Sequence, residues 1–205
     1  MGGVARATGG QLTAWAFALD DVQRGVSGSV ALIVPATVVA TLPCDNRTMC
    51  GDDRFIARRR VLTALVQRAL GPSVTPPRLV ADADGVRRIH GTPWFASVAE
   101  RSGWVAAAIA PHAVGIDLES QSDAPAARDA ILTDVITINL GAWHGLAGAW
   151  AAREAVLKAM GRDLTSDPGG WRFGDGTVTA ADSANYRVEI VARAGMVGAI
   201  SYVGG

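Results

Sequence analysis

The sequence of 205 residues contains few cysteines and histidines and lacks several common catalytic motifs. Its two cysteines, Cys44 and Cys50, form no CxxC pair and no Cys/His group with zinc-ligand spacing, so we expect inert thiols. The three histidines fit no HExxH pattern, and neither a GxSxG nor a Walker phosphate-binding motif is present. These absences disfavour zinc enzymes, histidine-activated nucleophiles and P-loop nucleotide hydrolases.

The chain also lacks long apolar segments and an excess of charge of either sign. The longest apolar run, residues 29–42, is too short to span a bilayer and contains Pro35. The N-terminus has no secretory signal pattern, so we expect a soluble, cytoplasmic protein. Nineteen basic and nineteen acidic residues balance, which disfavours attraction to nucleic acid or an anionic membrane. We therefore expect neither as a partner.

The 49% of hydrophobic residues suffices for one medium domain or two small ones. Apolar spacing predicts a helix over 52–70 and a helical region that ends near 161, with an interruption near 141. A polar turn is expected at 100–103. The expected strands are 11–18, 29–42, 78–80, 95–98, 104–109, 114–118, 186–192 and 197–203. This order predicts an α+β protein of two similar halves, residues 1–112 and 113–205.

Two carboxylates alternate along the predicted strand GIDLE, residues 115–119. The period of two sends Asp117 and Glu119 to one face, with their Cα atoms roughly 7 Å apart. Such side chains can converge on one hard cation such as Mg²⁺, which commonly binds one or two carboxylates besides water and substrate phosphate. The alternative is an edge strand with a solvated acidic face.

The predicted helix WAAREAVLKAMG, residues 150–161, places Trp150, Glu154 and Lys158 at i, i+4 and i+8 on one face. As surface decoration, a Glu–Lys pair would add about 0.3–0.5 kcal/mol to helix stability. However, Lys158 is the only lysine among 19 basic residues. A compact ammonium on a flexible stem can follow a phosphate oxygen or release its proton, and arginine cannot replace it in that role. Trp150 either lines the site or anchors the helix in the core.

Together, the GIDLE strand and the WAAREAVLKAMG helix resemble the paired signatures of the Sfp-like 4′-phosphopantetheinyl transferase superfamily. The segment PWFASVAERSGWVAAAI, residues 93–109, is similar to the family's Ser-x-x-His strand-turn-strand unit, and residues 54–60 more loosely resemble its arginine helix. The resemblance covers residues 52–164. It implies two similar α/β halves with the active site in the cleft between them.

The resemblance also implies a reaction. A serine of an acyl or peptidyl carrier protein attacks the pyrophosphate of coenzyme A, which releases adenosine 3′,5′-bisphosphate. The implied Mg²⁺ ligands are Asp117, Glu119 and Glu154, the implied catalytic residues are Glu154 and Lys158, and the implied coenzyme A contacts are Arg58, Arg59, Ser97 and Lys158. Helical spacing lets only one or two residues of the run 58–60 face the cleft. Since one chain supplies both halves, we expect a monomer.

One residue departs from the family pattern. Glu100 stands where the family commonly has a histidine that holds the 3′-phosphate of coenzyme A. A carboxylate there repels phosphate unless it turns away or is neutralised, and Arg101 is the nearest candidate for that. A degenerate homologue that binds coenzyme A or a carrier protein without transfer is therefore one alternative. A Mg²⁺-dependent nuclease is another, although the sequence has no extended basic stripe.

Overall fold

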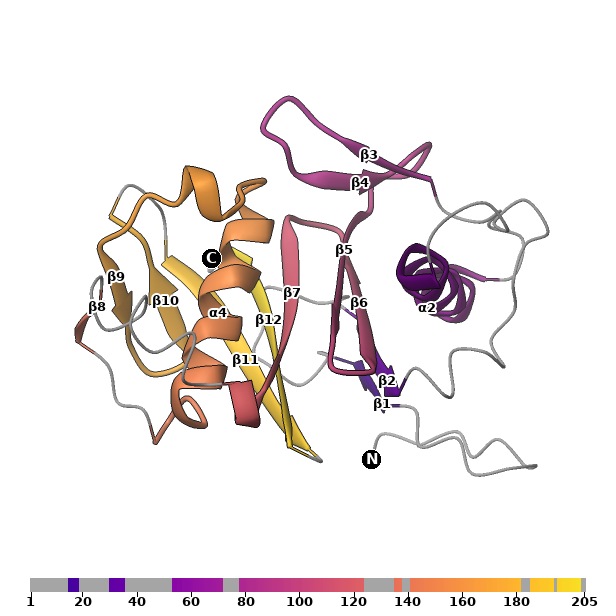
Figure 1. Ribbon diagram of the computed structural model, residues 1–205. Helices are drawn as coiled ribbons and strands as arrows, with labels where there is room; N and C mark the ends of the chain where they lie inside the picture. Colours follow the sequence, from indigo (N-terminus) through magenta and orange to yellow (C-terminus); the bar gives the residue numbers. More distant parts are fainter. Residues whose placement is uncertain are drawn as a thin grey trace.

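The computed structural model describes residues 15–18, 30–35, 53–71, 78–123, 135–137, 141–181, 185–193 and 195–203. These residues form two six-stranded sheets and two α-helices, so the expected α+β class with two halves is confirmed (Figure 1). Cys44 and Cys50 lie outside the described residues, and so does the start of the first expected strand.

The first sheet takes up the N-terminal half. Its strands are β1 (Trp15–Ala18), β2 (Val30–Pro35), β3 (Leu79–Ala81), β4 (Arg87–Ile89), β5 (Phe95–Arg101) and β6 (Trp104–Ala110). They are antiparallel in the order β1-β2-β6-β5-β4-β3. The helix α2 (Asp53–Leu70) covers one face of this sheet, where a helix was predicted from the apolar spacing (Figure 1).

The second sheet takes up the C-terminal half, in the order β7-β12-β11-β10-β9-β8. Its strands are β7 (Val114–Ser120), β8 (Val135–Thr137), β9 (Trp171–Phe173), β10 (Thr177–Thr179), β11 (Asn185–Arg193) and β12 (Met196–Val203). The helix α4 (Gly145–Ala159) packs against it. Neither described helix is long and apolar enough to cross a membrane.

The four layers follow from alternation along the strands. In β6, Val105, Ala107 and Ile109 pack toward α2, whereas Ala106, Ala108 and Ala110 face the second sheet. The small alanine side chains let the two sheets pack closely face to face. The resulting layer order is α2, first sheet, second sheet, α4 (Figure 1).

Two details of the sequence prediction are wrong. The β5–β6 hairpin pairs Arg101 with Trp104, so its loop has two residues and not the expected four. Ser102 and Gly103 both have positive φ, of 47° and 78°, as a tight hairpin turn requires. In addition, β8 lies within the region expected to be helical. Its sequence Val-Ile-Thr is entirely β-branched, which favours a strand, and it pairs in parallel with β9.

The two halves meet along β5, β6 and β7. The first sheet ends at Ala110 and the second begins at Val114, so the expected boundary between residues 112 and 113 falls in this connection. The backbone N–H of Ile116 in β7 donates to Ser97 Oγ in β5 at 3.1 Å, within the buried layer between the sheets. This hydrogen bond ties a strand of one half to a strand of the other.

Gly115 sets how closely α4 approaches β7. A Cβ at Gly115 would lie 1.8 Å from Ala155 O and 2.9 Å from Ala159 N, both in the α4 backbone. We expect Gly115→Ala to lower the free energy of unfolding by about 3 kcal/mol, because helix and strand must separate. In β12, Gly198→Ala is the matched control: its Cβ would meet flexible side-chain ends at 2.9 and 3.2 Å, and we expect a loss of about 1 kcal/mol. Urea denaturation measures both, and equal losses would contradict this assignment.

Candidate metal centre

The two acidic residues of β7 point toward α4. Ile116 and Leu118 lie in the apolar layer between the sheets, so the period of two turns Asp117 and Glu119 to the opposite face. Both acidic residues are buried, with exposed fractions of 5% and 7%. The prediction that Asp117 and Glu119 share one face of the strand is confirmed. The alternative, a solvated acidic face, is wrong.

The third carboxylate comes from α4. One ligand oxygen of each of Asp117, Glu119 and Glu154 lies within 4.8 Å of the others. The three predicted metal ligands, which are separated by up to 37 positions in the sequence, therefore meet at one place, which we call the carboxylate triad. Three oxygen donors at this spacing can converge on one small cation.

Lys158 lies one turn after Glu154 on α4 and reaches back to β7. Its Nζ donates to Asp117 Oδ1 at 2.5 Å and to the backbone oxygen of Ile116 at 3.1 Å. The Lys158 side chain is 32% exposed, whereas its partner carboxylate is buried. The only lysine of the chain thus contacts the triad directly.

Asp117 is the electrostatically strained member of the triad. Burial raises its pKa to about 6, the neighbouring Glu154 carboxylate adds to the increase, and the Lys158 ammonium opposes both. Its Oδ2 is buried and has no hydrogen-bond partner within the part of the chain that the structure describes. An orphaned, buried carboxylate oxygen in a group of carboxylates fits a bound cation, and an all-oxygen donor set suits hard ions such as Mg²⁺, Mn²⁺ or Ca²⁺.

Two further ion pairs border the site, and one of them brings a positive charge to Glu100. Arg58 Nε lies 3.4 Å from Glu100 Oε2, and Arg101 Nε lies 3.2 Å from Glu119 Oε2. The expectation that Arg101 is the residue nearest to Glu100 took no account of α2, which brings Arg58 to the same carboxylate. Glu100 is thereby neutralised, while Arg101 partly offsets the charge of the triad.

A pocket of about 270 Å³, which we call the lysine pocket, lies between the two halves and is lined by Lys158, the residue that contacts Asp117 of the triad. The first half lines it with Gly85, Arg87, Ala96, Ser97 and Val98, and the second half with Lys158, Gly161, Arg162, Asp163 and Ser166. The walls are close because the halves touch through glycines. A Cβ at Gly161 would lie 2.2 Å from Asp84 O, and one at Gly85 would lie 2.5 Å from Gly161 O.

A second hollow of about 310 Å³, which we call the arginine pocket, lies near the first. It is lined by Phe55, Arg58, Arg59, Leu62, Arg78, Leu79, Val80, Ala81, Arg87 and Val98. Arg87 and Val98 belong to both pockets, so the two hollows adjoin. Of the three consecutive arginines of α2, Arg58 and Arg59 line the pocket.

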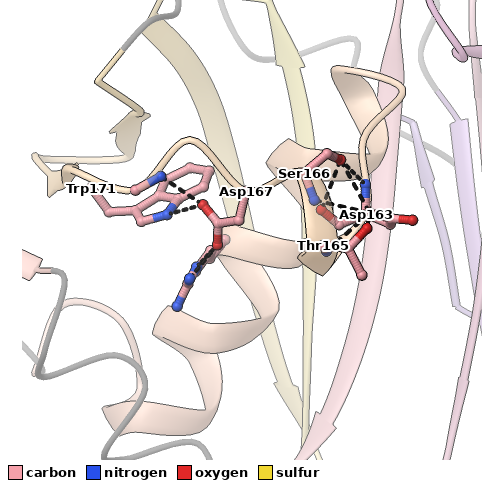
Figure 2. A network of polar contacts seen from close by, with 7 residues as sticks. Asp163, Thr165, Ser166, Asp167 and Trp171 are labelled. Atoms are coloured by element: carbon pink, nitrogen blue, oxygen red, sulfur yellow. Dashed lines mark hydrogen bonds and ion pairs between the residues drawn. The ribbon is translucent and has the colours of Figure 1, made fainter.

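A network of polar contacts orders the loop after α4, which lines the lysine pocket with Arg162, Asp163 and Ser166 (Figure 2). Asp167 accepts hydrogen bonds from Arg153 of α4, from the Gly169 backbone N–H at 2.9 Å and from Trp171 Nε1 at 2.9 Å. Nearby, Asp163 caps the short helix η4 (Leu164–Ser166). Hydrogen bonds from Thr165 and Ser166 lower the pKa of that carboxyl. The loop therefore holds Arg162 and Asp163 at the pocket without a ligand.

Sequence reasoning placed some of these residues and missed others. Ser97 and Lys158 both line the lysine pocket, although the Ser97 hydroxyl is buried and accepts from Ile116. Arg78, Arg87 and Arg162 were not among the candidates. The one sequence feature that could have indicated any of these pocket residues was the pair of arginines at 87–88, close to Gly85. Trp150 packs against the core around α4, so it serves at least as an anchor.

Comparison with known proteins adds no family assignment. No protein-family model matches the chain, and no curated protein matches it.

The raised pKa of Asp117 predicts a gain in stability from Asp117→Asn in metal-free protein. The Asp117 carboxyl group binds its proton more tightly in the folded protein than in the unfolded chain. Deprotonation of Asp117 between about pH 4 and pH 6 therefore lowers the free energy of unfolding by at most roughly 3 kcal/mol. An asparagine at this position cannot lose a proton, so the Asp117→Asn variant should keep this stability and be more stable than the wild type at about pH 7.5 with EDTA. The difference should vanish below about pH 4. Urea denaturation at both pH values measures it.

If Asp117→Asn were instead less stable at about pH 7.5, the pair with Lys158 would outweigh the burial of the charge. Addition of Mg²⁺ supplies an internal control, since it should stabilise the wild type and leave Asp117→Asn unchanged.

Proposed function

We propose that this protein transfers the 4′-phosphopantetheine arm of coenzyme A to a serine of an acyl or peptidyl carrier protein. The observation that carries the proposal is the carboxylate triad with Lys158 at the end of a basic hollow built by both halves. The two-half α+β fold and the sequence resemblance support the same family, the Sfp-like 4′-phosphopantetheinyl transferases, and the same specific transferase fold.

The donor set supports a metal ion as cofactor. Asp117, Glu119 and Glu154 would hold Mg²⁺, and the orphaned Asp117 Oδ2 is a ready ligand. When bound, Mg²⁺ would neutralise charge on the pyrophosphate and favour its orientation for in-line attack.

The charge of the adjoining pockets supports an elongated polyanion as substrate. Together the two pockets are lined by six basic residues and one acidic residue, namely Arg58, Arg59, Arg78, Arg87, Lys158, Arg162 and Asp163. Coenzyme A carries a pyrophosphate and a 3′-phosphate, and guanidinium groups bind phosphate oxygens bidentately. The pyrophosphate would lie by Lys158, next to the triad, with the nucleotide end toward Arg58 and Arg59. The Ser97 hydroxyl accepts one hydrogen bond but keeps its own hydrogen for a ligand oxygen.

The side chains of the triad suit the transfer step. The serine oxygen of the carrier protein attacks the phosphorus that bears pantetheine, so that a new P–O bond forms. The bond from that phosphorus to the bridging oxygen breaks, and adenosine 3′,5′-bisphosphate leaves. Glu154 accepts the serine proton, since a carboxylate can bind a cation with one oxygen and accept a proton with the other. Lys158 stabilises the departing phosphate or protonates it.

One observation favours a binding-only alternative. Arg58 forms an ion pair with Glu100. One of the arginines of the arginine pocket, where the nucleotide end of coenzyme A would lie, is therefore already partly neutralised. A homologue with weakened coenzyme A affinity could bind a carrier protein without modifying it.

The test is intact mass spectrometry of an apo carrier protein after incubation with this protein, coenzyme A and Mg²⁺. We expect a mass gain of one phosphopantetheine arm, abolished by EDTA and lowered at least roughly a hundredfold in rate by Glu154→Gln and by Lys158→Met. Glu189→Gln is the matched control. Glu189 pairs with Tyr202, 13 positions along the chain, and belongs to neither the triad nor the two pockets, so its variant should act at the wild-type rate.

No mass gain on several carrier proteins, despite measurable coenzyme A binding, would contradict the proposal. It would then favour the binding-only alternative, with Glu100→His as the rescue to try.

The adjoining pockets predict a separate effect on coenzyme A affinity. Arg87 lines both pockets, so Arg87→Ala should raise the KM for coenzyme A roughly tenfold and change kcat less, because it removes a charge-assisted phosphate contact. The exposed Arg172 of β9 lies outside both pockets and serves as the control. Steady-state kinetics with varied coenzyme A measure both variants. An unchanged KM in Arg87→Ala would remove these pockets from the binding site.

A further inference from the structure

Lys158 has two possible anionic partners, and the structure shows it with one of them. Its ammonium lies 2.5 Å from Asp117 Oδ1 and also contacts the backbone oxygen of Ile116. At the same time its side chain lines the lysine pocket and is one-third exposed. A four-carbon stem lets the ammonium move between a buried carboxylate and the pocket without displacing the helix.

The position on Asp117 is electrostatically opposed to a cation in the triad. The ammonium lies on Oδ1 of the same carboxylate whose other oxygen, Oδ2, has no hydrogen-bond partner among the described residues and is the ready metal ligand. A divalent ion that bound all three carboxylates would repel an ammonium held at Asp117. The same ion would also remove the negative charge that attracts the ammonium there.

We infer that Lys158 is the counter-ion of the triad in the metal-free protein, and that a divalent cation displaces its ammonium from Asp117 into the lysine pocket. Metal binding then frees the only lysine of the chain for a phosphate ligand. This displacement rests on the metal site of the proposed function, but it requires neither coenzyme A nor a carrier protein.

Two consequences distinguish displacement from a purely structural ion pair. The first is that Lys158 competes with the metal, so its removal should strengthen metal binding. The second is that the Lys158 side chain should gain mobility when the metal binds. A pair that merely ties α4 to β7 predicts the opposite on both counts, because its removal loosens the triad and because metal binding leaves the pair in place.

The chain's single lysine makes the second consequence directly measurable. Protein labelled with ¹³Cε,¹⁵Nζ-lysine gives one side-chain signal. Without metal, we expect restricted ¹³Cε motion and slow exchange of the ammonium hydrogens. Saturation with Mg²⁺ should abolish the slow exchange and mobilise ¹³Cε, at the Mg²⁺ concentrations at which calorimetry detects binding. Glu154→Gln keeps the Lys158–Asp117 pair but lacks one triad carboxylate, so its signal should stay unchanged over that range.

Metal affinity gives the second measurement. Lys158→Met should bind Mn²⁺ roughly tenfold more tightly than the wild type, by electron paramagnetic resonance, because a competing charged hydrogen bond is gone. An unchanged lysine signal in Mg²⁺-saturated protein, or weaker Mn²⁺ binding by Lys158→Met, would overturn the displacement while leaving the transfer reaction intact. Absence of any Mg²⁺ or Mn²⁺ binding would overturn both the displacement and the metal site of the proposed function.

Discussion

The backbone contact between β7 and α4 determines where the functional side chains lie. Gly115 has no side chain to keep Ala155 and Ala159 of the helix away from the strand. Glu154 and Lys158 immediately precede these two alanines, so the contact fixes both of them beside Asp117, the second residue after Gly115. The carboxylate triad thus depends on a distance between two backbones. A larger residue at position 115 would disturb the triad without touching any of its members.

The charged form of Asp117 is unfavourable to the fold. Three carboxylates meet at a largely buried place. Burial and the Glu154 carboxylate raise the pKa of Asp117 by more than the Lys158 ammonium lowers it, so the protein disfavours the negative charge there. A pair selected for stability alone would not combine such burial with an orphaned oxygen at Asp117. Locally unfavourable arrangements, such as buried charges, concentrate at functional sites. A divalent cation would compensate the buried charge of Asp117.

The sequence predicted what depends on regular periodicity. Alternation in β7 predicted that Asp117 and Glu119 share one face, and the i, i+4 spacing in α4 predicted the same of Glu154 and Lys158. That these two faces meet was expected only from the sequence resemblance. The residue pairs across elements depend on tertiary packing. Arg58 reaches Glu100 because α2 covers the first sheet, and no local pattern encodes that distance. The strand β8 was missed because a three-residue β-branched segment is too short to stand out within a region of helical character.

The ligand site also requires the two halves to be held together before any ligand arrives. Gly85 and Gly161 bring the turn after β3 against the end of α4, Ser97 binds the β7 backbone, and the Arg153–Asp167 pair holds the loop after α4. Each of these contacts is made within the protein itself, so the pocket walls would need no closure around the coenzyme A that we propose as substrate. Because preorganised walls leave little conformational entropy to be lost on binding, contacts of a ligand with the pocket arginines would contribute to affinity, and Lys158 is the side chain that we propose moves.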